Sequence, residues 1–202
     1  MRMPHVRRGI DMLIERSKKV LNDSGADMLF ITAPDLRFYL TGFASSDGLV
    51  VADKNGTSFY TDARYLEAAK NALSGSGIVV AEVPKGGYMS LADGAGRLAA
   101  AFDRITADEY VALTSRAKQV VNCTNEFNAA MSIKDEGELA AIKKACEIAD
   151  RAYTDMLGAF KEGMTENDAA AELEYCMRKF GASGTSFETI MAFGEGSSVP
   201  HH

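Results

Sequence analysis

The sequence predicts an α/β fold in which a mixed β-sheet flanked by helices comes first and a mainly helical region follows. Three observations support this prediction. Short apolar runs alternate with amphipathic stretches up to Asn122. The pair Asn55-Gly56, a strong hairpin signal, joins two segments rich in β formers. From residue 126 to residue 160 the chain has no proline and few glycines, which favours helix.

The first predicted elements are a helix over residues 7–24, which Gly25 ends, and a buried strand over 28–32, which Pro34 ends. Residues 48–52 and 57–61 then form an antiparallel pair of strands. These elements establish the helix-and-sheet character of the first region.

After the hairpin, the chain continues as pairs of one helix and one strand. Asp62 is placed to cap a helix over residues 63–73, and residues 78–83 follow as a buried strand. A helix over 88–102 with a strand over 104–106, and a helix over 108–117 with a strand over 119–121, complete the predicted sheet.

The second region is predicted to hold one long helix over most of residues 126–160, and a shorter helix over 169–180 that Thr165 caps. The change of character places the domain boundary between residues 125 and 126. The expected domains are therefore 1–125 and 126–202.

Composition narrows the classes of function. With 202 residues, 47% of them hydrophobic and 25% charged, and with no apolar run of membrane-spanning length, a soluble protein is expected. The net charge of −6 and the scattered basic residues argue against nucleic acid as a partner. The amino terminus lacks a signal-peptide pattern, so the expected location is the cytoplasm. The three widely spaced cysteines, Cys123, Cys146 and Cys176, are expected to be buried thiols.

Several motifs occur in an order that resembles the Xaa-Pro aminopeptidase and Xaa-Pro dipeptidase (prolidase) family. They are residues 39–43 (YLTGF), 61–65 (TDARY), 133–134 (IK), 163–166 (GMTE), 186–190 (SFETI) and 200–201 (PH). The resemblance covers nearly the whole chain. It implies a creatinase-like amino-terminal domain and then the first part of an α+β pita-bread peptidase domain, and Met131 departs from it because the family usually has Arg there.

The resemblance also implies a chemistry. The family holds a pair of divalent metal ions (Mn, Co or Zn) with two Asp, one His and two Glu, all of which would follow His202, so this chain alone is expected to bind no metal and to be inactive. The implied substrate is a proline-containing peptide, and a homo-oligomer is expected. His201 matches the family histidine that lies beside the metals and bonds the substrate or the oxyanion, and it is the candidate catalytic residue.

Other interpretations remain open at this point. His201 and His202 also suit a disordered tail or the remnant of a tag. Asp62 with Arg64 and Tyr65 is more typical of a helix cap and its first turn than of a polar site. Two alternative functions are a creatinase-type amidinohydrolase without metal and a non-catalytic protein that binds peptides or proteins. The residues after His202 distinguish these alternatives.

The helices of the second region lead to one further expectation. Their apolar faces need a sheet to cover them, and residues 189–193 are the only strand expected here. The 202-residue chain should therefore self-associate or leave this region loosely folded.

Overall fold

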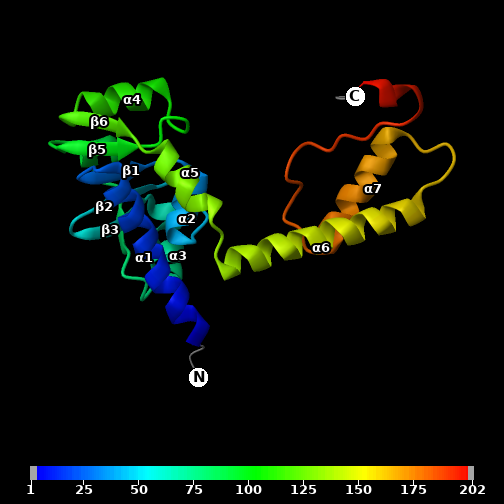
Figure 1. Ribbon diagram of the computed structural model, residues 1–202, viewed down its shortest axis with the longest axis horizontal. Coiled ribbons are helices and arrows are strands. Elements are labelled where there is room, and N and C mark those ends of the chain that lie inside the picture. Colours follow the sequence, from blue (N-terminus) through cyan, green and yellow to red (C-terminus); the bar gives the residue numbers. More distant parts are fainter. Residues whose placement is uncertain (1–3, 200–202) are drawn as a thin grey trace. The chain divides into compact units, whose positions relative to one another are not determined.

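The computed structural model describes the backbone of residues 4–199 and the side chains of residues 12–199. The chain divides into two compact units, Met1–Ile133 (unit 1) and Lys134–His202 (unit 2). Unit 1 contains the sheet, and unit 2 contains two helices and a long irregular segment (Figure 1).

Unit 1 is built on a six-stranded mixed sheet with the order β4-β3-β2-β1-β5-β6. The strands are β1 (Met28–Ile31), β2 (Leu49–Asp53), β3 (Gly56–Thr61), β4 (Val79–Glu82), β5 (Arg97–Ala100) and β6 (Gln119–Asn122). Strands β1, β2 and β3 pair antiparallel, whereas β4 adds in parallel to β3, and β5 and β6 add in parallel on the other side of β1. The predicted mixed sheet and the predicted hairpin are thus both confirmed.

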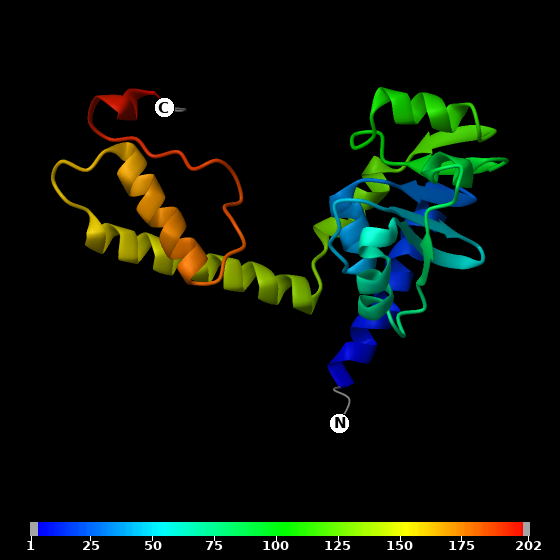
Figure 2. The same ribbon diagram turned by 180° about the vertical axis from the view of Figure 1, so that it is seen from behind.

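Alternate residues of each central strand enter two separate cores, as the two-residue period of a strand requires. One core combines Leu29, Val50 and Phe59 with the helices α1 (Pro4–Ser24), α2 (Pro34–Thr41), α3 (Ala63–Ala72) and α5 (Thr124–Ser132). The other combines Phe30 and Leu98 with η1 (Tyr88–Ala92) and α4 (Ala107–Thr114). Helices therefore cover both faces of the sheet, as Figure 2 shows from behind.

The helix predicted over residues 88–102 and the strand predicted over 104–106 are wrong. Residues 88–92 form only a short 3-10 helix, residues 97–100 are strand β5, and 104–106 is a loop that leads to α4. Alanine-rich Leu98–Ala101 favours helix by intrinsic propensity, but β5 lies between β1 and β6, where its side chains are almost fully buried. Tertiary burial has overridden local preference here.

Helix α2 and strand β4 also differ from the prediction. Helix α2 was not expected, because Pro34 was interpreted as the end of a strand, yet this proline begins the helix, where a missing N–H costs nothing. Strand β4 was expected to be buried but is an edge strand, with Val79 62% exposed. An edge strand has a neighbour on one side only.

Unit 2 consists of α6 (Glu136–Ala159), α7 (Glu166–Lys179) and the short η2 (Gly194–Ser198). Capping boxes begin both long helices: Asp135 with Glu138 starts α6, and Thr165 with Asp168 starts α7. The predicted cap at Thr165 is confirmed. The long helix predicted over most of residues 126–160 is α6, and it is preceded by the separate helix α5, since residues 133–135 are not helical.

The predicted strand over residues 189–193 is absent from the structure, where these residues are irregular. Cys123 and Cys176 are buried as expected, but Cys146 is exposed on α6. The predicted boundary at 125/126 falls within α5, and Phe127 of that helix belongs to the core of unit 1, so the chain divides eight positions later, after Ile133.

Candidate functional site

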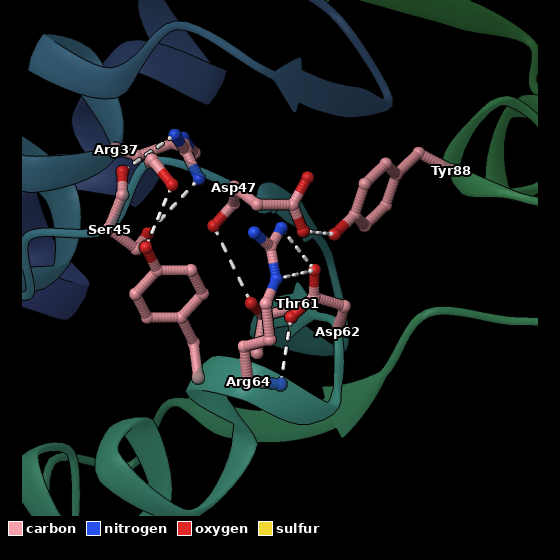
Figure 3. A network of polar contacts seen from close by, with 9 residues as sticks. Arg37, Ser45, Asp47, Thr61, Asp62, Arg64 and Tyr88 are labelled. Carbon is pink, nitrogen blue, oxygen red and sulfur yellow. Dashed lines mark hydrogen bonds and ion pairs between the residues drawn. The ribbon is translucent and has the colours of Figure 1, made fainter.

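A polar cluster surrounds the loop of residues 42–48, which joins α2 to β2 (Figure 3). Its centre is Arg37 of α2, a guanidinium that is only 2% exposed. Arg37 donates from Nη1 to the Ser45 hydroxyl (3.2 Å) and from Nη2 to the Ser45 carbonyl oxygen (3.1 Å). Burial lowers the pKa of Arg37, and the negative charge of Asp47 opposes that shift.

Asp47 is held from the other side of the cluster. The Tyr88 hydroxyl of η1 donates to Asp47 Oδ2, and the Thr61 hydroxyl donates to the Asp47 carbonyl oxygen (3.5 Å). Burial and the bond to Asp47 raise the pKa of Tyr88 well above its usual value, so Tyr88 stays protonated and remains a donor. Figure 3 shows the Asp47 carboxylate facing the Tyr88 hydroxyl.

The exposed rim of the cluster comes from the start of α3. Asp62 caps this helix by accepting from the Arg64 backbone N–H (2.9 Å), and it also accepts from Arg64 Nε and Nη2. The bond from the Arg64 side chain is the main reason that the pKa of Asp62 lies below its usual value. The predicted cap is confirmed. Tyr65, one residue further, bonds the Ser46 hydroxyl of the loop (2.8 Å).

The polar groups of this cluster hold the loop in place. The two guanidinium groups and two carboxylates balance in charge, and the hydroxyls of Tyr65, Tyr88 and Thr61 are used in bonds to the loop. Within residues 12–199, no group of three or more His, Cys, Asp or Glu side chains is arranged to hold a metal ion. His201, the predicted catalytic residue, lies outside the described residues, as does His202.

Sequence reasoning missed most of this cluster. It singled out Asp62, Arg64 and Tyr65 as one short segment, but not Arg37, Asp47 or Tyr88. The sequence offered one signal for Arg37, which stands among apolar residues in the short segment between Pro34 and Gly42. Nothing in the sequence pairs Asp47 with Tyr88.

Comparison with protein-family models divides the chain in the same way as its contacts do. Residues 14–130 match the creatinase/prolidase N-terminal domain, and residues 140–202 match metallopeptidase family M24. The first match covers more than half of the chain and falls within unit 1, and the second falls within unit 2.

Individual proteins give the same result. An uncharacterized peptidase of Bacillus subtilis, YqhT, is 32% identical over 94% of this chain and 55% of its own length. The structure of an Xaa-Pro dipeptidase from Bacillus anthracis superimposes with a TM-score of 0.85 at 28% identity, covering 95% of this chain and 55% of that one. Prolidase from Pyrococcus furiosus gives a TM-score of 0.81 at 25% identity, with 91% and 54% covered.

A six-stranded mixed sheet with helices on both faces, followed by a helical unit, is the arrangement of a creatinase-like domain joined to part of a pita-bread domain. The chain belongs to the Xaa-Pro aminopeptidase and prolidase family of metallopeptidases. It spans about half the length of the relatives that it matches. None of the helices in the described part of the chain is long and apolar enough to cross a membrane.

Proposed function

We propose that this chain is the amino-terminal part of an Xaa-Pro metallopeptidase, which hydrolyses the peptide bond before proline. The observation that carries the proposal is the order of the two family matches: a creatinase/prolidase N-terminal domain over residues 14–130 precedes the M24 match over 140–202. Relatives named as Xaa-Pro dipeptidases, 45% and 44% identical over 69 residues, add support.

The chemistry proposed for this enzyme needs two divalent cations and a donor for the developing oxyanion. A pair of divalent cations, held by five carboxylate and imidazole ligands carboxy-terminal to residue 202, would supply the activation of the attacking water molecule. His201 would supply the hydrogen-bond donor for the oxyanion that develops on the peptide carbonyl. Because the chain spans about half of its relatives, we further propose that the 202-residue chain by itself has no peptidase activity.

The experiment compares two purified proteins: the 202-residue chain, and the same chain with whatever follows it in its reading frame. Each is assayed with Xaa-Pro dipeptides and longer Xaa-Pro peptides in Mn²⁺, Co²⁺ or Zn²⁺, and with creatine in the absence of metal. Metal-dependent cleavage before proline by the longer protein alone is the expected result. Turnover of Xaa-Pro peptides by the mass-verified 202-residue chain would contradict the proposal, and turnover of creatine would favour the amidinohydrolase.

In the longer protein, His201→Ala should lower kcat by about 10²- to 10³-fold, the usual cost of one lost oxyanion donor. His202→Ala is the matched control, since His202 aligns with no motif residue, and it should change kcat little. Equal rates for both variants and the parent would show that His201 is not a catalytic group.

A further inference from the structure

The loop of residues 42–48 carries more contacts than a connection between α2 and β2 requires. Two glycines with positive φ bound it, Gly42 (φ 68°) and Gly48 (φ 143°), and the five residues between them form neither helix nor strand. Positive φ is a conformation that glycine adopts without strain, so backbone rotation is least costly at the two ends of this loop.

Side chains from four different elements hold the segment between the glycines. Arg37 of α2 bonds Ser45, Thr61 of β3 and Tyr88 of η1 bond Asp47, and Tyr65 of α3 bonds Ser46. An apolar contact adds to these bonds, because the ring of Phe43 packs edge-on against Phe59 of β3 at 5.8 Å between centroids. Figure 3 shows the labelled groups converging on the loop from both sides.

The loop contacts a buried arginine, which is an unusual residue in a protein interior. Arg37 is almost fully buried, and its Nε has no hydrogen-bond partner among the described residues. Buried cations are costly unless they are fully bonded and paired. The loop supplies both the acceptors of Arg37, at Ser45, and the negative charge of Asp47. If the loop moved away, Arg37 would lose the Ser45 acceptors and the neighbouring negative charge.

We propose that residues 42–48 form a glycine-hinged lid over Arg37, and that the Tyr88–Asp47 hydrogen bond is the latch that keeps the lid closed. The lid opens as a unit about Gly42 and Gly48 while the sheet beneath it stays folded. Tyr88 and Arg37 are therefore positioning residues, which act on the loop and not on a substrate. The inference concerns unit 1 alone and does not depend on peptidase activity.

The test is amide hydrogen exchange, measured by mass spectrometry on the 202-residue chain. Tyr88→Phe removes the latch hydroxyl and keeps the ring. Because a hydrogen bond to a charged group is lost, amides of residues 43–48 should exchange roughly ten- to hundredfold faster, with those of β1, β2 and β5 unchanged. Tyr110→Phe is the matched control: it makes the same chemical change on α4, and exchange in the loop should stay at the parent rate.

A second variant keeps the test decisive if Tyr88→Phe folds poorly. Asp47→Asn retains an acceptor for Tyr88 but removes the charge that faces Arg37, and it should also accelerate exchange in the loop. Loop exchange at the parent rate in both variants would overturn the proposal. So would equal acceleration in the loop and in the strands, because that result would show that the loop opens only when the whole unit unfolds.

Discussion

In unit 1 the apolar side chains of the sheet are covered on both faces, whereas in unit 2 most large apolar side chains of the helices face solvent. Among the described residues, unit 2 buries only Ala152, Met156, Ala169 and Cys176. All four lie on α6 or α7, the two helices that pack on each other. The exposed large hydrophobics of α6 include Leu139, Ile142, Tyr153 and Leu157.

This difference separates two sources of helix stability. The helices of unit 2 begin with complete capping boxes, which satisfy backbone donors locally, but caps contribute only about 1 kcal/mol each. The helices of unit 1 lie on a sheet and bury whole side chains, which contribute about 1.5 to 3 kcal/mol each. Local capping therefore helps the helices of unit 2 to form, but only the helices of unit 1 pack on a sheet and share a hydrophobic core.

The two units should differ most clearly in amide hydrogen exchange. Amides of α6 and α7 should exchange at least about 100-fold faster than those of β1, β2 and β5 in the 202-residue chain, because local opening of unit 2 exposes little additional apolar surface. Light scattering should show association beyond the monomer, since exposed apolar patches of this kind favour it. A monodisperse monomer with equal protection in both units would show that unit 2 is stable by itself.

A pair of core substitutions tests the same difference between the two units. Phe127→Ala, in the core of unit 1 and in edge contact with Tyr39, should lower the free energy of unfolding of that unit by about 3 to 5 kcal/mol. Met156→Ala, at a position of α6 that is only 3% exposed, should leave the main transition unchanged. Urea unfolding followed by circular dichroism measures both, and a comparable loss of stability in the two variants would mean that the units unfold together.

Substitutions at the two glycines of the loop compare the cost of a positive φ with the cost of a close contact. At Gly48, an added Cβ would lie 2.5 Å from Arg37 Nη1 and 2.8 Å from the Phe59 ring, so Gly48→Ala should cost about 2 to 4 kcal/mol. At Gly42 the nearest atom would be 3.9 Å away, so Gly42→Ala should cost only about 1 kcal/mol, from its positive φ. Similar losses for both variants in urea unfolding would contradict the close contact at Gly48.

The smallest expected effect concerns alkaline pH. The pKa of Tyr88 is raised in the folded unit by burial and by the bond to Asp47, with Asp62 adding to the shift and Arg37 opposing it. A group whose pKa is raised by folding contributes stability below its unfolded pKa of about 10 and loses it as the pH rises. Unit 1 should therefore lose stability above pH 10, and Tyr88→Phe should lose less. Parallel losses in both proteins would show that Tyr88 is not the group responsible.

Much of the secondary structure was predictable, because its signals are local. Asp62 and Thr165 cap the helices that their positions predicted, and Asn55-Gly56 lies at the turn between β2 and β3. Each of these signals acts over a few residues, through a side chain that bonds a neighbouring backbone group or a residue that suits a turn. The motifs that indicate the family are likewise short segments in a fixed order.

Which segments lie in the interior, and which distant groups meet, became known only from the three-dimensional arrangement of the chain. Leu98 and Ala99 have the local preferences of a helix, but they form a strand because β1 and β6 supply hydrogen-bond partners on both sides. Asp47 meets Tyr88 across 41 positions of sequence, which no local pattern encodes. Helix caps, the hairpin turn and the family motifs can be recognised in short stretches of sequence. The sheet order and the closed loop cannot, because burial and long-range pairing depend on how the whole chain packs.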